Sequence, residues 1–108
     1  MNDRFVCEIG SLRAGEPRDV QIRGEIDLAT APELEAQVAG AFAGGPSSVV
    51  LDLAGLTFID SSGLRALVAL SNRAGELGSA LALKNVPRHA QRVLDLTGLT
   101  DFFGSADS

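Results

Sequence analysis

The sequence predicts an α/β fold in which a mixed sheet of four to five strands packs against helices. Segments of strand and helix character alternate in the order strand, strand, helix, strand, helix, strand, helix. Strand–helix–strand connections favour parallel neighbours in one sheet. The chain has 108 residues, of which 45% are hydrophobic and 21% charged, and this suits one domain with an ordinary core. We therefore expect a single domain over 1–108, with its core over about 5–103 and a frayed tail over 104–108.

Two short strands are expected at the beginning of the chain. Residues 5–9 form an apolar segment, and residues 19–23 alternate, with Val20 and Ile22 on one face. The stretch 13–18 between them is rich in polar and breaker residues, which indicates a turn. The two strands are therefore expected to pair antiparallel.

A first helix is expected to begin at Thr30. Thr30 can cap the helix, Pro32 is tolerated in the first turn, and Glu33 stands at the third position of a capping box. The glycines and proline at 44–46 are expected to end it. Its apolar residues share one face: Leu34, Val38, Ala41 and Phe42.

The second half of the chain continues the alternation. Residues 49–53 read as a central strand, and residues 54–59 lead out of it. A second helix begins at Ser61 or Ser62 and closes at Gly78. Its inner face is formed by Leu64, Leu67, Val68, Ser71 and Ala74.

The end of the chain predicts one more strand and helix. Residues 80–84 form a short apolar strand, and residues 85–87 open a third helix that ends at Gly98. The pair at 102–103 is a candidate for a last short strand. All five phenylalanines lie in apolar stretches and are expected in the core: Phe5, Phe42, Phe58, Phe102 and Phe103.

Composition excludes several classes of function. The formal net charge of −5 repels phosphate backbones and anionic lipid, so we expect neither nucleic acid nor membrane as a partner. Cys7 is the only cysteine and His89 the only histidine, so neither a disulfide nor a cysteine zinc site is expected. We see no nucleotide-binding glycine loop and expect no cofactor. The cytoplasm is the expected compartment, since no secretory signal or membrane-spanning run is visible.

Two loops are the candidates for function. One is the Gly-Glu-Ile-Asp stretch at 24–27, and the other spans 57–64. Both follow strands and lead into helices, and crossover geometry brings such loops to one edge of a parallel sheet. We expect one exposed, partner-binding patch, formed by Asp27, Asp60, Ser61, Ser62, Gly63, Leu64 and Arg65.

The serines of the second loop allow more than one interpretation. Ser61 or Ser62 could simply cap the helix. Either could instead accept a phosphate, because a helix N-terminus favours negative charge. A catalytic nucleophile is disfavoured, because His89 is the only candidate base and is remote in sequence. A Mg²⁺ site formed by Asp27, Asp52 and Asp60 is a further, weaker hypothesis.

Three stretches together resemble the STAS-domain anti-sigma factor antagonists of bacteria. They are 24–27, 50–64 with its Asp-Ser-Ser-Gly turn, and 92–99. The resemblance spans about residues 5–103. It implies a small α/β domain that is a substrate and binding module rather than an enzyme.

The resemblance also implies a mechanism called partner switching. The unphosphorylated antagonist binds an anti-sigma factor with serine kinase activity, and the sigma factor is released. The kinase then phosphorylates the first serine after the motif's aspartate, here Ser61, and a PP2C-type phosphatase removes the phosphate. The alternative is a STAS domain without a switch, acting as a scaffold or adaptor in a signalling or transport complex.

Overall fold

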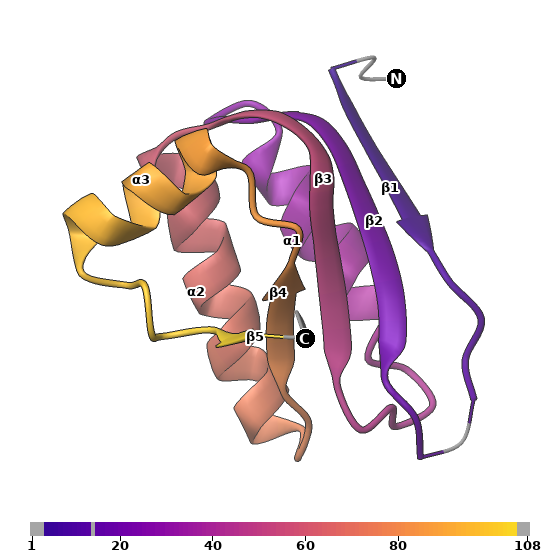
Figure 1. The fold of residues 1–108 in the computed structure, drawn as a ribbon. Coiled ribbons are helices and arrows are strands. Elements are labelled where there is room, and N and C mark those ends of the chain that lie inside the picture. Colours follow the sequence, from indigo (N-terminus) through magenta and orange to yellow (C-terminus); the bar gives the residue numbers. More distant parts are fainter. Residues whose placement is uncertain (1–3, 14, 106–108) are drawn as a thin grey trace.

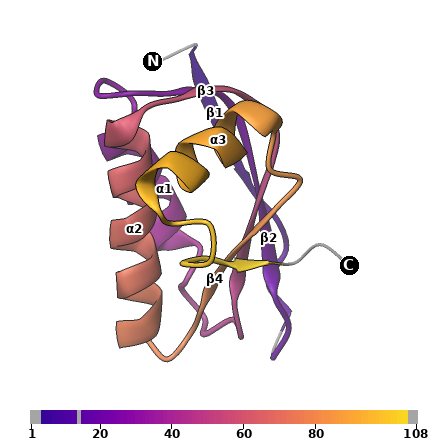
Figure 2. The same ribbon diagram turned by 60° about the vertical axis from the view of Figure 1, so that its left-hand side comes forward.

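The computed structural model describes residues 4–13 and 15–105, and over these residues it shows a mixed sheet with helices on one face (Figure 1, Figure 2). The predicted α/β class and element order are confirmed. The elements are β1 Phe5–Ile9, β2 Arg18–Ile26, α1 Ala31–Gly40, β3 Val49–Ile59, α2 Ser61–Glu76, β4 Leu81–Lys84, α3 Arg88–Thr97 and β5 Gly104–Ser105.

The strands lie in the order β1-β2-β3-β4-β5. β1 pairs antiparallel with β2, as expected, and every later pair is parallel. In the β2–β3 pair Ile26 stands opposite Ile59, the last residue of each strand. The carboxyl ends of β2 and β3 therefore meet at one edge of the sheet, and from there each strand leads into a helix (Figure 1).

The core fills the layer between the sheet and the helices. Val20, Ile22 and Ile26 of β2 are fully buried there. Apolar side chains of the predicted strands and helices are also buried: Val38, Phe42, Val50, Leu51, Leu67, Leu81 and Leu83. Val68 and Val93 are only half-buried and pack against the margin of the core. Burial of this layer holds both helix starts at fixed positions above the strand ends.

β2 and β3 are longer than the sequence pattern predicts. β2 continues through Ile26, so 24–26 is strand rather than loop, and β3 continues through 54–59 to Ile59. The β2–β3 ladder carries two register shifts, and such bulges break the alternation from which strands are recognised. Gly24 has a φ of +98°, and a Cβ there would collide with the Arg4 carbonyl oxygen. The glycine thus marks a bulge within the strand.

Two phenylalanines lie outside the core. Phe58 stands opposite Glu25 in the parallel ladder, so both side chains project from the face that no helix covers, and Phe58 is 45% exposed. Phe102 is 43% exposed, whereas Phe103 is buried. Strand pairing begins at Gly104, which stands opposite Ala82. The last strand is therefore Gly104–Ser105, not 102–103, and of the expected frayed tail residues 106–108 lie outside the described residues.

The helix ends agree partly with the prediction. α1 ends at Gly40, and turns follow through residue 44, with Ala41 and Phe42 still in the core. α2 ends at Glu76, two residues before Gly78. α3 ends at Thr97, and Gly98 directly after it terminates the helix as predicted, with the left-handed φ of 74° that favours glycine.

Candidate functional site

The two candidate loops lie side by side. The Asp60 backbone N–H donates to the Ile26 carbonyl at 3.2 Å, which ties the end of β3 to the end of β2. We refer to residues 27–30 and 60–65 together as the rim. The rim lies where β2 and β3 lead into α1 and α2, at one edge of the sheet (Figure 1).

Asp60 is the cap of α2. Its Oδ1 accepts hydrogen bonds from the backbone N–H groups of Ser62 at 2.9 Å and Gly63 at 3.1 Å. Its backbone is extended, with φ −117° and ψ −170°, as a cap residue requires. The expectation that Ser61 or Ser62 caps the helix is therefore wrong. Within the described part of the chain, neither serine hydroxyl has a hydrogen-bond partner.

Gly63 and Leu64 belong to the core rather than to an exposed patch. Leu64 is 4% exposed, and a Cβ on Gly63 would lie 2.7 Å from Ile26 Cγ2 and 2.8 Å from Ile59 Cγ1. The absent side chain thus lets the first turn of α2 rest directly on the two strand ends. Helical periodicity then turns Ser61 and Arg65 outward, and both are exposed.

Asp27 organises the other half of the rim. Its Oδ1 accepts from the N–H groups of Ala29 at 2.9 Å and Thr30 at 3.1 Å, and its Oδ2 pairs with Arg4. Partial desolvation acts to raise the pKa of Asp27, but the Thr30 hydrogen bond and the Arg4 ion pair outweigh it. The net pKa lies below its ordinary value, so Asp27 is an anion at neutral pH.

The expected capping box at α1 is not formed. The buried Thr30 hydroxyl donates to the Glu25 carbonyl at 2.9 Å and accepts from the Asp27 N–H at 2.9 Å, so it fixes the turn before the helix. Glu33 accepts instead from the Gln37 amide at 2.9 Å. Asp27 Oδ1 accepts instead from the amides of Ala29 and Thr30, which precede the helix, so the carboxylate closes the turn before α1.

The sequence patterns did not reveal Arg4, which contacts the rim, or Leu28, which belongs to it. Arg4 reaches Asp27 and Glu25 because β1 lies antiparallel beside β2, and only the register of that pair could have revealed it. Leu28 is 78% exposed between Asp27 and Ala29. The sequence signal for Leu28 was an apolar residue inside a polar loop that precedes a helix.

The alternative chemistries lose support. Asp52 accepts from the Ala54 N–H and the Asn85 amide, and it lies seven residues before the end of β3, about 23 Å from the rim. In the described ranges no three His, Cys, Asp or Glu side chains gather as a metal site. His89 Nε2 lies 2.9 Å from the Leu56 carbonyl oxygen, so the imidazole contacts the backbone of β3. The Mg²⁺ hypothesis is wrong.

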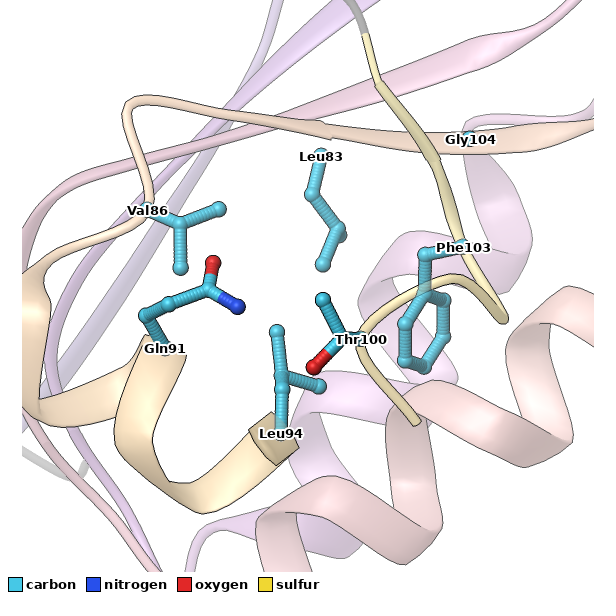
Figure 3. Close-up of a pocket in the computed structure, with 7 residues that line it drawn as sticks. All are labelled: Leu83, Val86, Gln91, Leu94, Thr100, Phe103 and Gly104. Atoms are coloured by element: carbon cyan, nitrogen blue, oxygen red, sulfur yellow. The ribbon is translucent and has the colours of Figure 1, made fainter. Parts of the chain in front are cut away.

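One hollow lies elsewhere, between β4, α3 and the C-terminal segment (Figure 3). Its volume is about 190 Å³, below the range of roughly 300–1,000 Å³ typical of small-molecule sites. The residues that line it are Leu83, Val86, Gln91, Leu94, Thr100, Phe103 and Gly104. Across 4–13 and 15–105, no helix has the length and apolar character needed to cross a bilayer.

Comparison with known proteins places this arrangement in a family. Residues 10–104 match the family model described as "Mlab, STAS domain". The putative anti-sigma factor antagonist BtrV of Bordetella bronchiseptica is 31% identical over 87 residues, which cover 81% of this chain and 75% of BtrV. The anti-sigma-B factor antagonist of Staphylococcus epidermidis is 31% identical over 83 residues, 77% of each protein.

A solved structure agrees with these relatives. The crystal structure of an anti-sigma factor antagonist from Mycobacterium paratuberculosis superimposes with a TM-score of 0.81 at 28% identity. The match covers 100% of this chain and 90% of that one. The chain therefore belongs to the STAS-domain family of anti-sigma factor antagonists, which are regulatory proteins rather than enzymes.

Proposed function

We propose that this protein binds an anti-sigma factor while Ser61 is unmodified, and that phosphorylation of Ser61 ends the binding. The anti-sigma factor supplies the serine kinase activity, a PP2C-type phosphatase reverses the reaction, and the cycle takes place in the cytoplasm. The observation that carries the proposal is the exposed position of Ser61 at the start of α2. Ser61 is the first residue of this helix, on a turn held by Asp60 and Gly63.

The phosphoryl transfer needs only a nucleophile from this chain. Ser61 Oγ attacks the γ-phosphorus of ATP, and the bond from that phosphorus to the β-phosphate oxygen breaks as ADP leaves. The hydroxyl proton passes to a base of the kinase. His89 contacts the Leu56 carbonyl rather than Ser61, so among the described residues no histidine is placed beside Ser61 as a base. This supports a substrate role for Ser61.

Phosphorylation changes the charge of the rim sharply. The phosphate adds about −1.5 to −2 charges at neutral pH. It lies beside Asp60 and on the same rim as the Asp27 anion. A partner packed against a neutral hydroxyl must then desolvate a dianion or leave, and each 1.4 kcal/mol lost is about tenfold in affinity.

The unmodified rim also has an apolar contact to offer. Leu28 is the most exposed large apolar side chain of the rim, and it stands next to Asp27. Such a side chain can bury apolar area against a partner that covers the rim. We therefore add Leu28 to the proposed partner surface, with Asp27, Asp60, Ser61, Ser62 and Arg65, while Gly63 and Leu64 support it from beneath.

The test is site-resolved mass spectrometry after incubation with a cognate kinase and ATP. Wild type and Ser62→Ala should carry phosphate on Ser61, and Ser61→Ala should carry none. Ser61→Ala should bind the kinase constitutively, and Ser61→Asp should bind roughly tenfold or more weakly. Phosphate found on Ser62 instead would show that the site is misassigned. A kinase that binds but never phosphorylates the chain would place it with the non-switching STAS scaffolds.

A further inference from the structure

Arg65 is an exposed cation on the rim. Several other basic side chains are committed to carboxylates: Arg4 to Glu25 and Asp27, Arg23 to Glu8, and Lys84 to Asp19. Within the described residues Arg65 has no ion-pair or hydrogen-bond partner, although its planar guanidinium is well suited to oxyanions. Its charge is therefore available beside Ser61.

The helix geometry points Arg65 at Ser61. Both residues are in α2 and both are exposed, four positions apart, so they are neighbours on the helix surface. Side chains of a helix lean toward its N-terminus, so Arg65 covers the turn that begins at Ser61. An anion that precedes a cation by four residues is also the more favourable order.

Three amides in the first turn of α2 are already occupied. The Ser62 and Gly63 N–H groups donate to Asp60 Oδ1, and the Leu64 N–H donates to the Asp60 carbonyl at 3.0 Å. A phosphate on Ser61 could use these donors only by displacing Asp60. The neighbouring carboxylates, Asp60 and Asp27, repel it. A nearby cation would therefore stabilise the phosphate.

We infer that Arg65 is the internal counter-ion of phosphorylated Ser61. This inference rests on the proposed function, because it takes Ser61 as the modified residue. The guanidinium donates two hydrogen bonds to the phosphate oxygens and closes over the first turn of α2. Phosphorylation then withdraws both the Ser61 hydroxyl and the Arg65 charge from a partner, so one modification changes two contacts of the rim.

The test uses phosphoserine inserted at position 61 during synthesis, so no kinase is needed. The second ionisation of the phosphate, ordinarily near pH 6, is followed by phosphorus NMR. Arg65→Gln should move the midpoint upward by about 0.2 to 0.7 pH unit, the size expected of an exposed pair. Arg65→Lys should restore part of the shift, because it keeps the charge but not the planar fork.

The matched control is Arg73→Gln. Arg73 is also an exposed arginine of α2, two turns further along, and its loss should leave the midpoint unchanged. Equal midpoints for Arg65→Gln and Arg73→Gln, with helix content intact by circular dichroism, would overturn the inference. The proposed function fails on different evidence, namely the mapped phosphosite and the binding of the kinase, so the two failures are distinguishable.

Discussion

The two helix starts on the rim use the same hydrogen bonds and present different side chains. Each begins with Ile-Asp at the end of a strand, and each aspartate accepts the backbone N–H groups two and three residues later. Asp27 Oδ1 accepts from Ala29 and Thr30, and Asp60 Oδ1 accepts from Ser62 and Gly63. In both loops the carboxylate closes the turn between strand and helix.

The loops differ in the residues after the aspartate. Ser61 exposes a hydroxyl directly after Asp60, whereas Leu28 exposes an apolar side chain directly after Asp27. The third residue is Gly63 in one loop and the fully buried Thr30 in the other. The aspartates thus build the rim, while the residues that follow them give each half its chemistry. Direct contact of Asp27 or Asp60 with a partner stays a prediction.

The largest effect is expected at Leu64. Leu64→Ala removes a buried side chain beneath the serine turn and should destabilise the protein by about 2–5 kcal/mol. Leu28→Ala, in the other loop of the rim, should stay within about 0.5 kcal/mol because Leu28 is exposed. Urea unfolding measures both. Similar small costs for the two variants would mean that Leu64 faces solvent after all.

The next effect is expected at Gly63. Gly63→Ala places a Cβ under 3 Å from Ile26 and Ile59 and should cost about 1–3 kcal/mol through overpacking. Gly75→Ala is the matched control, because it lies in the same helix with no atom near its added Cβ. It should stabilise by roughly 0.5–1 kcal/mol. If Gly63→Ala matches Gly75→Ala in thermal unfolding, the helix start does not rest on the strand ends.

Local patterns predicted the elements well where the backbone is regular. β1 coincides with the predicted 5–9, and Gly98 ends α3 as predicted, because alternation and a left-handed glycine are local signals. The ends of β2 and β3 were missed because their pairing continues through bulges, where alternation fails. Phe58 was assigned to the core from its apolar neighbours, yet the register turns it to the uncovered face.

The site was predictable in position but not in detail. The Asp-Ser-Ser-Gly turn located the start of α2, because a polar turn between a strand and an apolar helix face is a strong local signal. The burial of Gly63 and Leu64 depends on how two strand ends meet beneath the helix, which no local pattern encodes. The Arg4–Asp27 pair likewise depends on a contact between residues 23 positions apart.

A smaller effect is expected from the cap of α2. Asp60→Ala removes the acceptor of the Ser62 and Gly63 amides and should cost about 0.5–2 kcal/mol. Ser62→Ala should stay within about 0.5 kcal/mol, because its hydroxyl makes no cap bond. Denaturant midpoints compare the two. If Ser62→Ala lost as much stability as Asp60→Ala, the serine hydroxyl rather than the Asp60 carboxylate would be the cap.

The smallest expected effect is a pH dependence of the protein's stability that arises from the ion pair between Asp27 and Arg4. Because the folded-state pKa of Asp27 is depressed, the folded protein binds its proton less readily than the unfolded chain. This contribution to stability is therefore present above the ordinary carboxyl pKa near 4 and is lost as the pH falls through the folded value. Arg4→Gln removes one cause of the depression and should raise the Asp27 pKa toward its ordinary range.

The measurement is the difference in urea midpoint between wild type and Arg4→Gln at several pH values. The urea midpoint of wild type should be higher than that of Arg4→Gln at pH 7. This difference should become steadily smaller below about pH 4. The pKa of Asp95 is also depressed, by its hydrogen bonds from Thr100 and Gln91, but Asp95 is the same in both proteins and cancels in the difference. A difference in midpoint that stays constant down to pH 3 would mean that Arg4 stabilises the protein through packing. The Arg4–Asp27 ion pair would then contribute nothing to stability.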